Sequence, residues 1–313
     1  MTRRGKWRLG LWAGIAVIVG AVLVFSAMRP ANTYDSLAAV PIEKVPARQW
    51  NGAEKPRIGV AFGGGGVRGF MHLGAIKALD EAGIRADVVT GSSAGAIAAA
   101  LYATGKPYVE LEQIAMSARN VDFADLALKR QGLINGQALA RWVNNAIDHR
   151  RFADMAMPLG ITVTDLTGNR ALLVVDGDVG RAAQASASIP GTFVPVTSGD
   201  AVWVDGAILT IVPVKFARAL GADRVIAIDI YCGNQPTPKF NAVDTVVQAV
   251  RLQSCTLGRD DMAEADMLVR PEFEPKNPLS FRERQAAIDA GYHAMKAMLD
   301  AHPDWRARAR VKN

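Results

Sequence analysis

Residues 57–103 read RIGVAFGGGGVRGFMHLGAIKALDEAGIRADVVTGSSAGAIAAALYA, and this stretch decides the fold class. A short β-rich run, Arg57–Phe62, leads into four consecutive glycines, and Gly69–Ala82 then repeats apolar residues at the spacing of a helix. A second strand, Asp87–Thr90, is followed by another glycine-containing turn and an alanine-rich helix, Ala94–Ala103. Two strand–helix units in succession predict a parallel sheet with helices on both faces.

The rest of the chain continues the alternation of helical and strand patterns without an internal repeat. We expect helices over 108–118, 137–147 and 281–299, and strands over 160–164, 171–175, 202–204 and 224–230. The predicted fold class is therefore α/β, with a mainly parallel central sheet.

The first glycine-rich turn, Gly64–Gly69, lies between a predicted strand and a helix. Backbone N–H groups at such a turn bind negative charge, and glycine permits the close approach that this requires. The string also fits the dinucleotide-binding pattern G-x-G-x-x-G, which needs an acidic residue at the end of the second strand. Asp87 lies at the beginning of that strand instead, and a plain tight turn is a third interpretation. The residues of the turn are Gly64, Gly65, Gly66, Val67, Arg68 and Gly69.

The second glycine turn has the G-x-S-x-G spacing of a nucleophile elbow, in which a sharp strand-to-helix turn lifts a serine above the sheet edge. Its residues are Gly91, Ser92, Ser93, Ala94 and Gly95. The carboxyl ends of neighbouring parallel strands meet at one edge of a sheet, so the two turns should lie side by side. One turn would then supply an anion-binding backbone and the other a nucleophile, as acyl transfer requires.

A serine nucleophile needs a base, and the residues alone leave its identity open. The four histidines, His72, His149, His293 and His302, have no supporting local motif, although His293 remains possible in a Ser–His–Asp order. Two aspartates precede glycine, Asp176 and Asp205, and a turn explains either one. Asp205 lies between two apolar runs, and apolar surroundings raise the pKa of a carboxyl toward the range useful for a base.

In combination these motifs resemble the patatin-like phospholipases, specifically the bacterial group related to the neuropathy target esterase catalytic domain. The glycine loop of that family is matched by Gly64–Gly69, its G-x-S-x-G by Gly91–Gly95, and its D-G-[A/G] by Asp205-Gly206-Ala207. A further family segment matches Ala185–Gly191. The four motifs occur in order, and the resemblance covers roughly residues 57–300.

The resemblance implies a patatin-like three-layer sandwich in which Ser93 is the nucleophile and Asp205 the proton acceptor, without a histidine. It implies an oxyanion hole from the amides of Gly64–Gly69 and a lipid acyl-ester substrate. The sequence shows no calcium or zinc site, so we expect no metal, and we expect no cofactor. Two other functions stay open: a dinucleotide-binding oxidoreductase, and a catalytically silent, membrane-tethered lipid-binding protein. Arg68 could shape the loop or meet a lipid phosphate. Four side chains could line an acyl pocket or pack in the core: Met116, Phe152, Met155 and Met157.

The amino terminus has the pattern of a membrane anchor. Residues 1–8 hold four of the cations behind the net charge of +6, which leaves +2 on the rest and argues against a nucleic-acid-binding face. Residues 9–28 are uncharged and long enough to span a bilayer, so we expect a single-pass anchor with a cytoplasmic amino terminus and a periplasmic or external domain. Export after signal cleavage is the alternative.

The remaining boundaries follow from composition. We expect a proline-containing tether over 29–56, a hydrolase domain over 57–303 and a basic tail over 304–313. Cys232 and Cys255 are interpreted as buried free thiols rather than a disulfide. No feature of the sequence specifies an oligomeric state.

Overall fold

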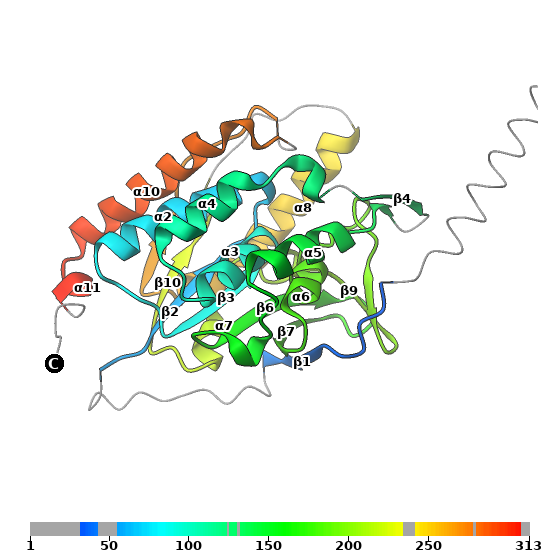
Figure 1. The fold of residues 1–313 in the computed structure, drawn as a ribbon, viewed down its shortest axis with the longest axis horizontal. Helices are drawn as coiled ribbons and strands as arrows, with labels where there is room; N and C mark the ends of the chain where they lie inside the picture. The colour runs from blue at the N-terminus through cyan, green and yellow to red at the C-terminus, as the bar shows by residue number, and fades with distance from the viewer. Residues whose placement is uncertain are drawn as a thin grey trace, which may run out of the picture.

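A computed structural model describes residues 32–42, 55–123, 125–129, 132–233, 242–277 and 280–307. Its centre is a nine-stranded mixed sheet in which β1-β7-β6-β3-β2-β10-β11 form the main path and the β8–β9 pair joins through β6 (Figure 1). The strands are β1 (Ala38–Pro41), β2 (Ile58–Phe62), β3 (Val88–Ser92), β6 (Leu159–Asp165), β7 (Arg170–Asp176), β8 (Val196–Ser198), β9 (Ala201–Asp205), β10 (Arg224–Ile228) and β11 (Met267–Val269). A separate hairpin consists of β4 (Leu126–Lys129) and β5 (Gly132–Ile134).

The middle of the sheet is parallel and one side of it is antiparallel. Strands β6, β3, β2, β10 and β11 run parallel to one another, whereas β7 pairs antiparallel with both β1 and β6. Strand β9 also pairs antiparallel with β6. The expectation of an α/β fold with a mostly parallel sheet is confirmed, and the antiparallel strands make the sheet a mixed one.

Helices cover both faces of the sheet, and alternate side chains along each strand point to opposite faces. On β2 and β10, Val60 and Ile226 belong to one buried apolar cluster, while the neighbouring residues Ala61 and Val225 belong to another. The first cluster includes α2, α3 and α10, and the second includes α7 and α9. The α-helices are α2 (Phe70–Glu81), α3 (Ala94–Ala103), α4 (Tyr108–Ser117), α5 (Gln137–Ala146), α6 (Val179–Ser186), α7 (Val214–Ala219), α8 (Ala242–Leu257), α9 (Arg259–Ala263), α10 (Arg284–Ala301) and α11 (Asp304–Ala307). Short 3-10 turns are η2 (Gly66–Gly69), η3 (Asn120–Phe123), η4 (Phe152–Asp154), η5 (Gly206–Ile208) and η6 (Phe281–Glu283).

Part of the expected tether is folded onto the domain. Residues 32–42 run along the open edge of β7, where β1 adds a short antiparallel strand. Tyr34 and Leu37 are buried there, and the Tyr34 hydroxyl donates a 2.6 Å hydrogen bond to Gln184 Oε1. The folded unit therefore begins before residue 57. Burial of Tyr34 and Leu37 removes their apolar surface from water, which stabilises this segment on the domain, whereas a solvated tether would leave that surface exposed.

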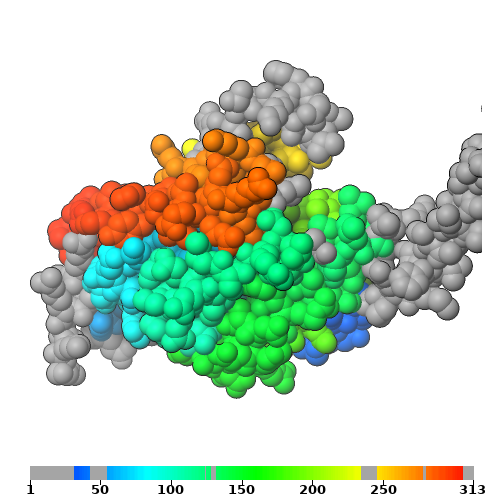
Figure 2. All heavy atoms as spheres, turned by 45° about the horizontal axis from the view of Figure 1, so that its top comes forward, coloured from blue at the N-terminus to red at the C-terminus, as the bar shows by residue number. Residues whose placement is uncertain are grey.

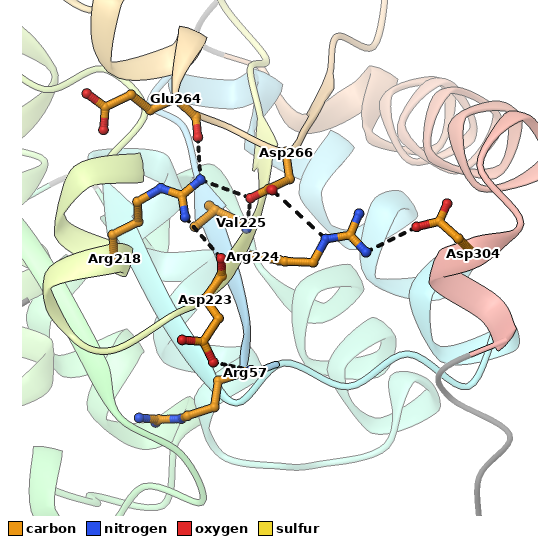
Figure 3. A network of polar contacts seen from close by, with 8 residues as sticks. All are labelled: Arg57, Arg218, Asp223, Arg224, Val225, Glu264, Asp266 and Asp304. Carbon is orange, nitrogen blue, oxygen red and sulfur yellow. Dashed lines mark hydrogen bonds and ion pairs between the residues drawn. The ribbon is translucent and has the colours of Figure 1, made fainter. Parts of the chain in front are cut away.

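The carboxyl-terminal residues are also attached. Figure 3 shows Arg224, at the start of β10, between two carboxylates: its Nη1 lies 3.1 Å from Asp304 Oδ2 and its Nε 3.9 Å from Asp266 Oδ1. The guanidinium also stacks at 3.8 Å from the ring centre of the buried Trp305. The residues expected to begin a tail at position 304 are therefore part of the folded domain, and the basic residues 308–313 lie outside the described residues.

The two cysteines correct the expectation of free thiols. Cys232, just after β10, and Cys255 in α8 form a disulfide with a sulfur–sulfur distance of 2.07 Å. Their pairing depends on how α8 packs beside the loop after β10, which sequence spacing does not reveal.

No helix in the described part of the chain is long and apolar enough to cross a membrane. The predicted anchor, residues 9–28, lies outside the described residues and stays a prediction.

Candidate active site

Strand β6 brings the two principal candidate residues together. On one edge of β6, β3 runs parallel and ends with Ser92 opposite Thr162. Farther along β6, β9 runs antiparallel and ends with Asp205 opposite Val163. Because β3 and β9 end opposite neighbouring residues of β6, their ends face each other, although Ser93 and Asp205 are more than a hundred residues apart in the chain.

Ser93 lies in a strained turn between β3 and α3. Its backbone has φ 54° and ψ −122°, a conformation that non-glycine residues rarely adopt. A Cβ on Gly91 would overlap the Gly95 carbonyl, and one on Gly95 would overlap the Phe62 carbonyl, so both flanking positions require glycine. This geometry is that of the nucleophile elbow predicted from G-x-S-x-G.

The Ser93 hydroxyl donates a 2.7 Å hydrogen bond to Asp205 Oδ2. Both side chains are almost completely buried, with 5% and 4% of their surface exposed. Asp205 Oδ1 accepts a second bond, of 2.8 Å, from the Ala207 N–H at the start of η5. Burial raises the pKa of Asp205 to about 6, because desolvation outweighs the two hydrogen bonds that stabilise the carboxylate.

The glycine loop is fixed at its beginning and open in its middle. The Gly64 N–H donates to the Ile211 carbonyl at 2.9 Å, which removes it from the set of candidate oxyanion donors. The Arg68 N–H donates back to the Gly65 carbonyl at 3.3 Å within η2. Among the described residues, the N–H groups of Gly65 and Gly66 have no protein acceptor. Gly66 has φ +59°, which favours glycine, and it lines the same cavity as Ser93.

Space for Ser93 also depends on the loop. A Cβ on Gly64 would lie 2.9 Å from Ala207 Cβ and 3.2 Å from Ser93 Cβ. The loop can approach the Ser93–Asp205 pair this closely only because position 64 has no side chain.

Two buried polar side chains hold the loop. His72 Nε2 donates to the Gly63 carbonyl at 2.7 Å, and complete burial lowers the pKa of this imidazole to about 4, so it is neutral at physiological pH. Arg68 forms an ion pair with Glu274 and stacks 5.3 Å from the ring centre of Tyr231. Both contacts give Arg68 a structural role.

An apolar cavity of about 490 Å³ opens beside Ser93. Its walls come from the glycine loop, α2, α3, α4, α5 and the segment after α6. Apolar side chains make up nearly all of this lining; Leu73, Ile97, Leu111, Trp142, Phe193 and Phe281 are examples. A cavity of this composition accommodates an alkyl chain and offers little to a charged ligand.

Other candidates from the sequence lie elsewhere. Among the described residues no histidine lines the cavity, and Asp176 stands exposed at the end of β7, where its Oδ1 accepts from the Gly177 N–H. The four side chains proposed for an acyl pocket do not line this cavity either: Phe152 is buried in the core, Met155 and Met157 pack against it, and Met116 is exposed.

One supporting residue was not singled out from the sequence. Ser186, at the end of α6, is fully buried, and its Oγ accepts a 2.8 Å hydrogen bond from the Ser93 N–H. The available signal was its position within the family segment Ala185–Gly191. That segment also carries Ser188, whose carbonyl accepts from the Asp205 N–H at 3.0 Å. Both residues of the pair are thus attached to the end of α6.

Comparison with known proteins gives the family. Residues 60–218, which include the glycine loop, the elbow and Asp205, match the family model described as patatin-like phospholipase. The chain belongs to the patatin-like phospholipase family. It is 28% identical over 282 residues to an uncharacterized NTE family protein of Mycobacterium tuberculosis, covering 79% of this chain and 47% of that one. It is 31% identical over 193 residues to lysophospholipase NTE1 of Mycosarcoma maydis, covering 58% of this chain and 10% of that protein.

The patatin-like chain thus spans about half the length of its mycobacterial relatives and a small part of the fungal one. Among solved structures, VipD from Legionella pneumophila superposes with a TM-score of 0.53 at 13% identity. That match covers 89% of this chain and 73% of VipD, and it supports a shared fold.

Proposed function

We propose that this patatin-like protein is a serine acyl hydrolase that cleaves fatty-acyl esters of phospholipids or lysophospholipids. The observation that carries the proposal is the 2.7 Å hydrogen bond from the Ser93 hydroxyl to Asp205 at the wall of an apolar cavity. Family membership and the similarity to a lysophospholipase support a lipid ester as substrate. They also disfavour the dinucleotide-binding alternative.

In the first step, Ser93 Oγ attacks the ester carbonyl as its proton passes to Asp205 Oδ2. A pKa of about 6 leaves Asp205 mostly ionised at neutral pH and closer to the working pH than an ordinary aspartate. The oxyanion accepts hydrogen bonds from the N–H groups of Gly65 and Gly66, with the Ala94 N–H at the start of α3 as a further donor. Asp205 then returns its proton to the leaving alcohol.

In the second step, Asp205 takes a proton from water as the water attacks the acyl-Ser93 ester. The acyl–Oγ bond then breaks, the fatty acid leaves, and Asp205 returns the proton to Ser93 Oγ. Throughout, the alkyl chain occupies the apolar cavity, which removes its surface from water and holds the ester beside Ser93.

The test is a comparison of Ser93→Ala and Asp205→Asn in the full chain. We expect each variant to lose at least ~10³-fold in kcat/KM on lysophospholipid and on a short-chain p-nitrophenyl ester, because each removes half of the nucleophile–base pair. A fluorophosphonate probe should label the unsubstituted chain at Ser93. Asp176→Asn, at the other Asp-Gly dipeptide, is the matched control and should stay active. Full activity in either dyad variant contradicts the proposal.

A further inference from the structure

The β4–β5 hairpin exposes apolar side chains beside the cavity. It forms a two-stranded sheet of its own, apart from the central sheet. Leu126 is 66% exposed and Leu133 is 55% exposed. One exposed leucine needs no explanation, but two on one short hairpin indicate a contact surface.

The same hairpin forms part of the cavity wall. Ile134, at the end of β5, lines the cavity and pairs with Phe193, which lines it as well. The Leu133 N–H donates to the Thr192 carbonyl at 2.9 Å, so β5 is fastened to the segment after α6. In that segment Ile189 both lines the cavity and is 42% exposed. Leu126, Leu133 and Ile189 are therefore exposed apolar side chains beside the cavity, and together they are called the apolar rim.

The first described residue, Asn32, lies close to this rim. Asn32 Nδ2 donates a 2.7 Å hydrogen bond to the carbonyl of Asn135, the residue directly after β5, and Asn32 Oδ1 accepts from Gln137 Nε2 at 3.1 Å. Only residues 29–31 separate Asn32 from the uncharged stretch 9–28. Three extended residues reach ~10 Å, so a bilayer that holds residues 9–28 must lie close to the Asn32 side of the domain.

We propose that the rim formed by Leu126, Leu133 and Ile189 lies on the surface of a phospholipid bilayer. The inference rests on the proposed function and on the predicted anchor, because it takes the cavity to receive an acyl chain. Contact at the rim would let the acyl chain pass from the lipid into the cavity without exposing its methylene groups to water.

The proposal can be tested on the full chain reconstituted into phosphatidylcholine nanodiscs. Leu133→Cys is labelled with an environment-sensitive NBD fluorophore; the native cysteines are joined in the disulfide and do not react. Val109→Cys is the matched control. Val109 is about as exposed as Leu133, at 60%, but it lies near the start of α4 in charged surroundings, next to Glu110, which pairs with Lys106. We expect a blue shift and quenching by doxyl-labelled phospholipid at position 133, and neither at position 109.

Each other outcome overturns the proposal. An unquenched label at position 133 shows that the rim does not contact lipid. A blue shift without quenching by doxyl-lipid assigns the rim to a contact with a second copy of the chain. Quenching at Val246→Cys in place of position 133 assigns the lipid contact to α8, where Val246 is 63% exposed and outside the cavity lining.

A second measurement separates docking from catalysis. We expect Leu126→Asp/Leu133→Asp to lower hydrolysis of bilayer phospholipid about tenfold while hydrolysis of a soluble short-chain ester stays unchanged, because neither leucine lines the cavity. Equal rates on bilayers for the variant and the unsubstituted chain contradict the proposal. If the protein hydrolyses no ester at all, the proposed function fails, while the fluorescence measurement still decides the docking surface.

Discussion

Asp205 shows at the scale of one residue how a proposed catalytic group can weaken the fold that holds it. The carboxyl is 4% exposed and has hydrogen bonds from Ser93 and Ala207, yet burial still raises its pKa to about 6. A native carboxyl with a raised pKa binds its proton more tightly than the unfolded chain does. Its ionisation therefore lowers the free energy of unfolding as pH rises from about 4 to about 6.

We therefore expect the free energy of unfolding of Asp205→Asn, relative to that of the unsubstituted chain, to be higher at neutral pH than at acid pH. The asparagine does not ionise, so the variant escapes a loss of ~3 kcal/mol that the unsubstituted chain undergoes across this pH range. Urea unfolding at pH 4 and pH 7 measures the difference. The stability gap between the two proteins should grow in favour of the variant from pH 4 to pH 7, and an unchanged gap would contradict the prediction.

Ser186 is the residue that we expect to position the nucleophile. Ser186→Ala leaves the buried N–H of Ser93 without its acceptor, which costs ~1–3 kcal/mol and allows the strained elbow to relax. We predict a roughly tenfold fall in kcat with little change in KM, together with a lower rate of fluorophosphonate labelling. Ser188→Ala is the control, because the Ser188 hydroxyl donates within its own helical turn to Gln184. Equal losses in both variants would argue for a general packing effect.

At the scale of elements, α2 and α10 pack closely against each other near the site. Figure 2 shows α10, in orange to red, packed along α2, in cyan. A Cβ on Gly74 would overlap the Ile288 carbonyl, and one on Gly291 would overlap the Met71 carbonyl, so each helix presents a glycine to the backbone of the other. Because α2 carries His72, this close crossing also supports the glycine loop.

Gly291→Ala should therefore force the two helices apart. The added methyl group has backbone atoms rather than flexible side chains as neighbours, and we predict a loss of ~3 kcal/mol in the free energy of unfolding. Chemical denaturation gives the value. Ala297→Leu, at an exposed position of α10, enlarges the same helix where nothing opposes it and should change stability by less than ~0.5 kcal/mol. Similar effects for the two substitutions would contradict the close crossing.

At the scale of the whole molecule, segments near the two ends of the described chain pack against the central sheet. Residues 32–42 cover the edge of β7, and Trp305 packs on Arg224 at the amino ends of the parallel strands, opposite the edge that carries Ser93. The Cys232–Cys255 disulfide fastens α8 to the loop after β10, close to Tyr231, which stacks on Arg68. Disulfides persist mainly in oxidising compartments, and the periplasmic or external location expected for the domain stays a prediction.

Loss of this disulfide should destabilise the domain. It closes a loop with a sequence separation of 23 residues, and cross-links of this length restrict the unfolded chain by ~3 kcal/mol. We predict that Cys232→Ser/Cys255→Ser lowers the free energy of unfolding by about this amount. Maleimide labelling of unfolded protein should detect no thiol before reduction and two after it. Two thiols before reduction would show that the bridge is absent.

The sequence by itself determined the features that depend on neighbours along the chain. The glycine loop, the elbow around Ser93 and the helices α2, α3, α4 and α5 follow from glycine positions and apolar spacing, and the structure confirms them. Helix α8 was missed because its periodicity is misleading: its buried face includes the polar residues Arg251 and Ser254, while Val246 and Val250 are exposed. Strand β1 was missed because it is defined only by the edge of β7.

Only the tertiary structure decided which groups meet. Asp176 and Asp205 both precede glycine, and their local patterns do not separate them; the register of β9 on β6 brings Asp205 to Ser93 and leaves Asp176 exposed. Tertiary packing also decided three other contacts: the hydrogen bond from the Ser93 N–H to Ser186, the Cys232–Cys255 disulfide, and the hydrogen bond from the Gly64 N–H to Ile211. The physical reason is that local sequence specifies backbone conformation, whereas contacts across a hundred residues depend on which strand edges pair and on how the helices then pack.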